Sequence, residues 1–247
     1  MSTDTAPPGN FAWHAFSGGQ RSHAVGDQFL LRCGPIIAAA SDTDVHNRTS
    51  SLKRWVSPGE TVFIAGFNWG EVDGFEVVHR STVLQMVGPH PNIDACMNLG
   101  KVRRLDRSHL ESMAKLANEC HVTPLTEFTF GLGSHFGIFL EGMLVAMAGT
   151  RMQFKQWIEL AGICTRASQR GQGLATALIR HALKHVHRER GRSMLHVEAS
   201  NVNAIALYDQ MCFRTVRQEP LVVLRRCTRL PASDMPLRAE HEVEQYL

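Results

Sequence analysis

A glycine-containing loop is the first feature of this sequence that points to chemistry. It lies between an apolar run and a helix-like run and reads Arg170-Gly171-Gln172-Gly173-Leu174-Ala175. Glycines there permit positive φ and let an anion approach the N–H groups at a helix start, where the helix dipole is positive. The pattern predicts an anion cradle, most simply for phosphate. The alternative is an ordinary tight turn between a strand and a helix.

Two nucleotide-binding motifs are excluded at this loop. A P-loop requires Lys and Ser or Thr directly after its glycine, and this chain has Leu174. The dinucleotide fingerprint requires Gly or Ala three positions after Gly173, where the chain has Thr176. Glu198 lies roughly where a ribose-binding acid would follow, but few residues remain beyond it for further βαβ units.

A carboxylate, Glu159, interrupts the apolar strand predicted over residues 157–165. Alternation along a strand puts it on the same face as Ala161, Ile163 and Thr165. We expect burial to raise its pKa and to suit it to act as a general base toward an ammonium group, directly or through water. The alternative is an edge carboxylate in contact with solvent.

Two other reactive residue types are given no catalytic role. Cys164 ends the same strand, but the sequence places no activating histidine beside it. His181 and His185 have the helical spacing of metal ligands, with His187 nearby. They lie among Lys and Arg residues, so a solvated basic face is the better interpretation, and no metal is expected.

The glycine loop and a second motif together resemble the GNAT superfamily of acyl-CoA-dependent N-acyltransferases. Arg170-x-x-Gly173-x-Ala175 matches the Arg/Gln-x-x-Gly-x-Gly/Ala signature of that superfamily. The stretch 201–213 is similar to its Asn-x-x-Ala-x-x-Leu-Tyr element and contains Asn201, Ala204, Leu207, Tyr208 and Phe213. The resemblance covers about residues 98–226. Two departures are Ala167, where proline is common, and Cys212, where glycine is usual.

The resemblance implies a fold and a set of site residues. The fold is α/β, with a mixed twisted sheet flanked by helices, in which strands 157–165 and 194–197 run parallel and splay around the pantetheine arm of CoA. Tyr208 would protonate the departing thiolate, whereas the alternative is a half-buried aromatic. The implied CoA-binding residues are Ile163, Cys164, Thr165, Arg170, Gly171, Gln172, Gly173, Leu174, Ala175, Asn201 and Asn203. For the two asparagines the alternative is helix capping.

The elements that must position these residues follow hydrophobic periodicity. In the second half we expect a helix from 106 or 108 to about 119, a helical turn or loop at 124–131 and a helix from 174 to near 191. The strands are expected at 102–105, 137–140, 143–149, 157–165, 194–197 and 219–226, with Glu141-Gly142 as a hairpin turn. The first half shows strands at 28–33, 60–67 and 76–87 and a short helix at 51–56.

We expect three segments: an N-terminal domain at 1–97, a GNAT domain at 98–230 and a charged tail at 231–247. The smaller N-terminal α/β domain carries no recognised motif, and its content fits a degenerate second copy of the same fold. A break at Gly88-Pro89-His90-Pro91 precedes the boundary.

Composition excludes several classes of protein. A net charge of +3 is too mild to indicate a nucleic-acid partner, and no apolar run approaches a membrane span. The six cysteines are scattered without a Cys-x-x-Cys pair, which favours reduced thiols. With no secretory signal pattern at Met1, we expect a cytoplasmic protein, either monomer or homodimer.

The combined prediction is an N-acetyltransferase that moves the acetyl group of acetyl-CoA to an amine by direct attack. Two alternatives stay open. One is a CoA-binding sensor or regulatory protein without turnover. The other is an N-terminal interaction module fused to a catalytic half. The amine acceptor is not identified by the sequence.

Overall fold

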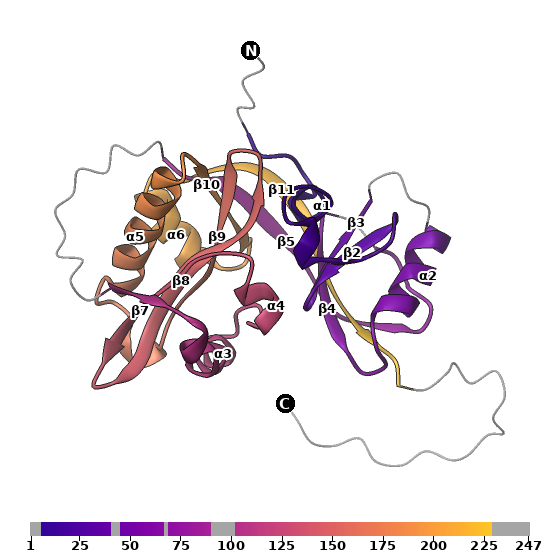
Figure 1. The fold of residues 1–247 in the computed structure, drawn as a ribbon, viewed down its shortest axis with the longest axis horizontal. Coiled ribbons are helices and arrows are strands. Elements are labelled where there is room, and N and C mark those ends of the chain that lie inside the picture. Colours follow the sequence, from indigo (N-terminus) through magenta and orange to yellow (C-terminus); the bar gives the residue numbers. More distant parts are fainter. Residues whose placement is uncertain (1–5, 41–44, 67–68, 90–101, 229–247) are drawn as a thin grey trace.

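The described residues of the computed structural model, 6–40, 45–66, 69–89 and 102–228, build one continuous sheet with helices on its faces (Figure 1). Its eleven described strands run in the order β1-β2-β3-β4-β11-β5-β10-β9-β8-β7-β6. The expected mixed, twisted sheet flanked by helices is therefore confirmed.

The second half of the chain forms nearly every element that periodicity predicts. The strands are β6 (Val102–Leu105), β7 (His135–Leu140), β8 (Met143–Phe154), β9 (Trp157–Thr165), β10 (Arg192–Glu198) and β11 (Arg214–Arg226). The helices are η2 (Arg107–His109), α3 (Leu110–Glu119), α4 (Glu127–Phe130), η3 (Ala167–Gln169), α5 (Leu174–Arg188) and α6 (Val202–Gln210). The predicted turn between β7 and β8 is confirmed, because Glu141 and Gly142 both have positive φ, 49° and 79°.

The first half is less regular than the second. Its elements are α1 (Phe11–Ser17), η1 (Arg21–His23), β1 (Val25–Gly26), β2 (Leu30–Cys33), β3 (Ile36–Ala39), α2 (Val45–Trp55), β4 (Thr61–Ala65) and β5 (Phe75–Val87). Helix α1 and strand β3 were not expected, and α2 begins six residues before the predicted start at Ser51.

Strand β5 joins the two halves into one sheet. It pairs antiparallel with β10, where Met86 lies opposite Leu195, and antiparallel with β11, where Met86 lies opposite Thr215. Strand β11 also pairs with β4, for example Val222 with Ile64. The expected boundary at residue 97 and the tail 231–247 lie outside the described residues, so the domain division stays a prediction.

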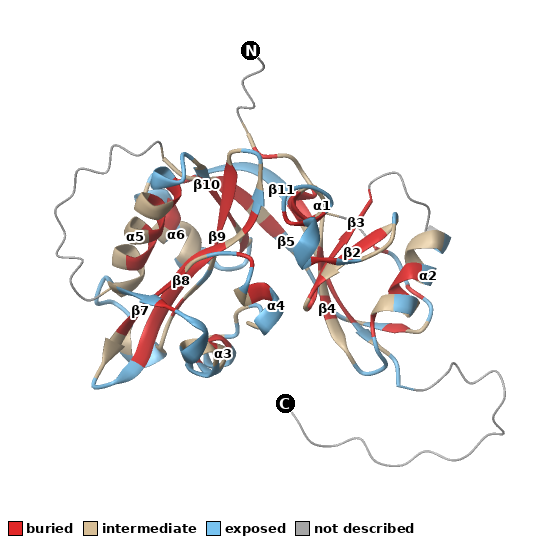
Figure 2. Cartoon of the chain, in the orientation of Figure 1, coloured by how far each residue is buried: buried red, intermediate tan, exposed pale blue. Residues whose placement is uncertain are grey.

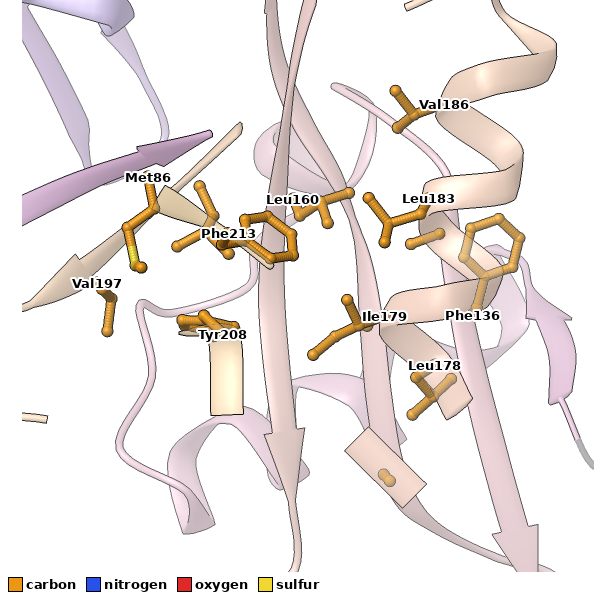
Figure 3. Close-up of a cluster of buried hydrophobic side chains, with 14 of the residues drawn as sticks. Met86, Phe136, Leu160, Leu178, Ile179, Leu183, Val186, Val197, Tyr208 and Phe213 are labelled. Atoms are coloured by element: carbon orange, nitrogen blue, oxygen red, sulfur yellow. The ribbon is translucent and has the colours of Figure 1, made fainter. Parts of the chain in front are cut away.

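Helix α5 covers one face of the sheet with the apolar stripe that its sequence predicts. Figure 2 shows a buried stripe along the helix, and Figure 3 shows its side chains packed toward Phe136 and Leu160. Each buried Leu, Ile or Val side chain contributes about 1.5–3 kcal/mol when fully buried. The buried residues of the helix are Leu178, Ile179, Ala182, Leu183 and Val186.

Two expectations from composition concern cysteines and membranes. Five cysteines are free thiols, namely Cys33, Cys120, Cys164, Cys212 and Cys227, and Cys96 lies outside the described residues. Among the described helices, none is both long and apolar enough to cross a membrane.

Candidate active site

The centre of the site is a gap between two parallel strands. β9 and β10 pair from Trp157 opposite Arg192 to Leu160 opposite Leu195, and β9 then runs on to Thr165 without a registered β10 partner. The prediction that these two strands run parallel and then splay apart is therefore confirmed. On its other side β9 bulges, because the ladder to β8 pairs Ala161 with Gly149 and Cys164 with Met147.

The bulge places two successive residues of β9 opposite one residue of β8. Gly162 and Ile163 together oppose the single residue Ala148, and Gly162 takes the left-handed φ of 63°. Both residues line the cavity described below. An N–H group that points away from a ladder into a cavity is a donor for a ligand oxygen.

The glycine loop at the start of α5 has the geometry that an anion cradle needs. Gly171 and Gly173 have φ of 77° and 74°, and a Cβ at either would meet no described atom within 4 Å. Gly173 is the N-cap and supplies no side chain to the first N–H groups of the helix. Residues 170–173 are exposed, so these donors face open space at a helix start.

Cys164 and Thr165 end strand β9, just before this loop, and their side chains differ in environment. Burial raises the pKa of the Cys164 thiol, which packs against Met113 and Met147 in the core below α3. This thiol is therefore held in its neutral form and is unsuited to nucleophilic attack. The hydroxyl oxygen of Thr165 is buried and has no hydrogen-bond partner within the described residues, while Arg170 Nε donates to the Thr165 carbonyl over 3.3 Å.

The second motif forms α6 and the turn after it. The Asn201 side chain accepts a hydrogen bond from the N–H of Ala204 over 3.1 Å, so it caps the helix, and Asn201 also lines the cavity. Asn203 is exposed and is not among the cavity-lining residues. Cys212 has φ of 63°, which is the left-handed backbone that glycine favours, so the departure from glycine leaves this turn in place.

Tyr208 lies at the junction of core and cavity. Its ring is buried beside Phe213, with ring centroids 5.7 Å apart, and it lines the cavity (Figure 3). Burial raises the pKa of Tyr208 to about 12. The phenol therefore stays protonated at neutral pH and is available as a donor. It is more buried than the half-buried aromatic that was the alternative.

A cavity of about 630 Å³ lies between the two halves of the chain. Its wall includes Ile163 and Tyr208 from the second half and Phe11, Ile36 and Phe63 from the first half. A volume of this size accommodates a small-molecule substrate.

Glu159 differs from the sequence prediction. Its carboxylate is fully buried, but the Arg151 guanidinium donates to its two oxygens, over 2.9 Å each, and His196 Nδ1 lies 2.9 Å from Oε1. Burial alone would raise the pKa of Glu159, yet these partners lower it to about 2. The expected rise in pKa is thus wrong, since the sequence did not reveal the cation opposite it on β8.

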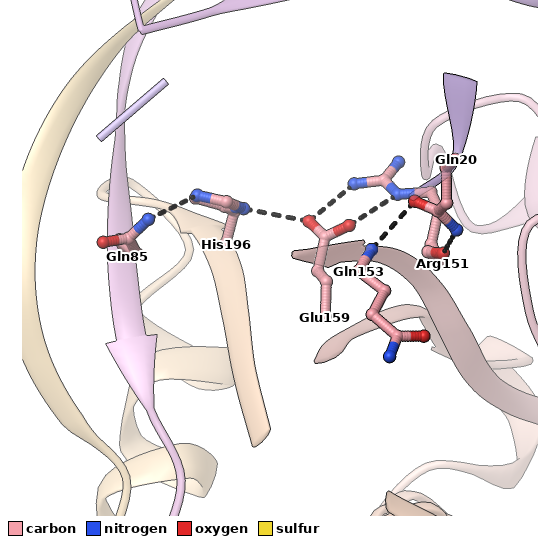
Figure 4. Close-up of polar contacts among 6 residues, drawn as sticks. All are labelled: Gln20, Gln85, Arg151, Gln153, Glu159 and His196. Carbon is pink, nitrogen blue, oxygen red and sulfur yellow. Dashed lines mark hydrogen bonds and ion pairs between the residues drawn. The ribbon is translucent and has the colours of Figure 1, made fainter. Parts of the chain in front are cut away.

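A polar chain therefore crosses four neighbouring strands (Figure 4). It runs from Arg151 through Glu159 and His196 to Gln85, whose Nε2 lies 3.4 Å from His196 Nε2. Gln85 Nε2 also donates to the Pro8 carbonyl over 3.0 Å, which fixes the orientation of the amide. A Gln85 N–H faces His196 Nε2, so Nε2 is the acceptor and Nδ1–H donates to Glu159.

His196 is the site residue that sequence reasoning missed. It lies on β10 and lines the cavity with only 13% of its side chain exposed. The one signal in the sequence was a histidine in the middle of an apolar strand; in the structure it lies one residue beyond the last registered pair with β9. Figure 4 shows its ring between Gln85 and Glu159.

Comparison with known proteins agrees with this arrangement. The acetyltransferase (GNAT) family model matches residues 103–213. The fold is similar to that of a GNAT-family protein from Novosphingobium aromaticivorans, with a TM-score of 0.79, 28% identity, and coverage of 90% of this chain and 100% of that one. A comparison with curated proteins found no match.

Two further solved structures share the fold at lower identity. A GCN5-related N-acetyltransferase from Kribbella flavida has a TM-score of 0.55 and 16% identity, covering 87% of this chain and 94% of that one. A GCN5-related N-acetyltransferase-like protein from Streptococcus suis has a TM-score of 0.50 and 16% identity, covering 82% of each chain.

The fold and the family match thus define an acyltransferase, from a family whose members use acyl-CoA donors. More particularly, residues 103–213 form a GNAT-family acetyltransferase domain.

Proposed function

We propose that this protein is an N-acetyltransferase that moves the acetyl group of acetyl-CoA to an amine by direct attack. The observation that carries the proposal is the splay between β9 and β10, with the glycine cradle following β9 along the chain and Tyr208 buried at the cavity wall. The cradle offers helix N–H donors to the pyrophosphate, through residues 170–175. At the splay, pantetheine would lie against the backbone of Gly162 and Ile163, at the bulge of β9.

The residues at the splay fit such a donor. Ile163, Cys164 and Thr165 lie along the chain between cavity-lining Gly162 and the cradle, and the Thr165 hydroxyl has no partner within the described residues. The side-chain amide of Asn201, at the cavity wall, is a second partner for a pantetheine amide, whereas exposed Asn203 has weaker support. The Ile163 N–H is the candidate donor to the oxygen of the attacked carbonyl.

The proton balance requires one acceptor and one donor. The amine loses a proton, its nitrogen bonds to the carbonyl carbon, and the bond from carbon to sulfur breaks as the thiolate leaves. The Tyr208 hydroxyl donates a hydrogen bond to that sulfur. A phenol with pKa of about 12 would not give up its proton fully to a thiolate whose conjugate thiol has pKa ~8.5. We therefore infer that Tyr208 shares the proton as the thiolate forms.

We assign the proton acceptor to the pair Glu159 and His196. With a pKa of about 2, Glu159 is a poor base by itself. Its carboxylate holds the Nδ1–H of His196. It would stabilise the imidazolium formed when the amine displaces the Gln85 N–H from His196 Nε2 and that nitrogen takes the amine proton. Glu159 thus acts through His196 and is a positioning residue in this proposal.

A panel of amines tests the function. Each amine is mixed with acetyl-CoA and the full chain, and the release of free thiol is measured together with acetylated product by mass spectrometry. We expect amine-dependent thiol release with matching product. Binding of CoA in a thermal shift assay, with no thiol release from any amine, would contradict the proposal and support the sensor alternative.

A further inference from the structure

The acceptor side of the cavity contains a buried carboxylate, Glu219, that the reaction scheme does not use. Glu219 lies on β11, is only 6% exposed and lines the cavity. Its Oε1 accepts a hydrogen bond from the N–H of Asn10 over 2.9 Å. Arg217 Nε lies 3.9 Å from the same oxygen, which is too far for a hydrogen bond.

The second carboxylate oxygen of Glu219, Oε2, is the one that could bind a ligand. Within the described residues, Oε2 makes no hydrogen bond or ion pair. Glu219 lines the cavity, and we place the ligand of this oxygen there. A carboxylate that is largely removed from water and keeps one oxygen free has strong affinity for a cation with N–H donors.

The strand register places Glu219 at a distance from the site of transfer. Glu198, at the end of β10, lies opposite Val83 on β5, and Val83 lies opposite Glu219 on β11. Residues directly opposite one another share a face, so the two carboxylates flank Val83 with Cα atoms about 10 Å apart. Glu198 is next to the splay, whereas Glu219 is two strands farther from it.

The cavity between these points is suited to an apolar chain with a positive end. Its lining near Glu219 includes Ile36, Phe63, Val83 and Leu221. The charge of Arg151 is balanced by Glu159, and burial lowers the pKa of His135, so that histidine stays neutral at pH 7. The two carboxylates on the wall have weaker partners than Glu159: Glu198 has His79 at 3.5 Å, and Glu219 has Arg217 at 3.9 Å. The titratable lining residues are His121, His135, Arg151, His196, Glu198, Tyr208 and Glu219.

We propose that Glu219 binds a second positive charge on the acceptor, so that the preferred acceptor is a diamine or another amine with a remote cation on an apolar spacer. This inference rests on the proposed function. One nitrogen lies at the splay and attacks the acyl group, while the other, as an ammonium, donates to Glu219 Oε2. The first half of the chain thus sets acceptor specificity. It does so through the main chain of Asn10, which holds Glu219, and through the cavity wall around Phe63.

The test compares diaminohexane with hexylamine, which have the same spacer and differ in the second ammonium. The wild-type chain should prefer the diamine in kcat/KM. Glu219→Gln keeps an acceptor for the Asn10 N–H and removes the charge, so the ratio of diamine to monoamine kcat/KM should fall about 10- to 100-fold. Glu76→Gln is the matched control, because Glu76 is an exposed carboxylate on β5 outside the cavity, and it should leave the ratio unchanged.

A binding readout separates this inference from the proposed function. In the presence of CoA, diaminohexane should raise the melting temperature of the wild-type chain more than hexylamine does, and Glu219→Gln should remove the difference. A wild-type chain that acetylates both amines equally, or a Glu219→Gln variant with an unchanged ratio, overturns the inference while leaving the N-acetyltransferase proposal intact. Failure of the wild-type chain to release thiol with any amine counts against the proposed function itself.

Discussion

Arg151 and Glu159 form a bidentate ion pair across the neighbouring strands β8 and β9. Nε and Nη2 of Arg151 each lie 2.9 Å from one oxygen of Glu159. The Glu159 side chain is 1% exposed and that of Arg151 is 20% exposed. Each charge is therefore kept from water and depends on the other, which makes the pair sensitive to the loss of a single partner.

Removing one member of this pair should destabilise the fold strongly. Glu159→Gln and Arg151→Met each leave a buried charge without its counterion, so we expect each to lower the free energy of unfolding by about 3–5 kcal/mol. The double variant should lose much less than the sum of the two losses. Urea unfolding of the four proteins measures this coupling. Additive losses would show that the two residues do not depend on each other.

The same carboxylate should give the protein a specific response to acid. Its pKa is about 2 in the folded chain and ~4.3 in an unfolded one. The folded state binds fewer protons between these values, so the contribution of Glu159 is complete above pH ~4.3 and is lost as the pH falls toward 2. Melting temperatures measured across this range should fall more steeply for wild type than for Glu159→Gln. Parallel curves would contradict the low pKa.

Tyr208→Phe should separate catalysis from packing. The change removes one oxygen and keeps the ring beside Phe213, so the melting temperature and acetyl-CoA affinity should change little. Loss of a proton donor typically lowers the rate by about 10²–10⁴-fold. The measurements are kcat and the melting shift caused by acetyl-CoA. Turnover within about threefold of wild type would show that the proton donor is water or another group.

Gly173→Glu should abolish donor binding by placing bulk and negative charge at the cradle. Acetyl-CoA at about 100 times its dissociation constant adds ~2.7 kcal/mol, which is roughly a 5–11 °C melting shift for a chain of this size. The variant should show no such shift. Gly142→Glu is the control, because Gly142 also has positive φ and open space but lies in the β7–β8 turn. A normal shift in Gly173→Glu would refute the cradle assignment.

A chain that begins at residue 94 should fail to fold. Such a truncation removes β5 and leaves β10 and β11 without the strand between them, and it also removes Met86 from the core. We expect insoluble protein, or soluble protein without a cooperative unfolding transition. A folded, active fragment would instead support an independent catalytic half with a fused interaction module.

Local patterns predicted the second half of the chain well because each element there carries its own signal. The α5 stripe, the Glu141-Gly142 turn and the two motifs depend on residues close in sequence. The start of β11 was placed five residues too late, at Glu219 in place of Arg214. Its first five residues, 214–218, are all exposed and include two arginines, so the sequence there lacked the apolar alternation of a strand.

The site was predicted less completely than the fold because its chemistry depends on register. That Glu159 would be buried was correctly anticipated, but its pKa depends on Arg151 and His196, which reach it only through particular strand pairings. Likewise, Gln85 contacts His196 only because β5 lies beside β10. No spacing within one segment reveals such contacts.

The insertion of β5 also has a consequence for how the chain is made. Residues 75–87 leave the ribosome long before residues 194–198 and 214–226, which are their partners. Until those arrive, this strand has two open edges and an unburied Met86. Its pairings close very long loops, so we expect slow folding, with a late step that completes both halves at once. The nascent chain is most prone to aggregation during that interval.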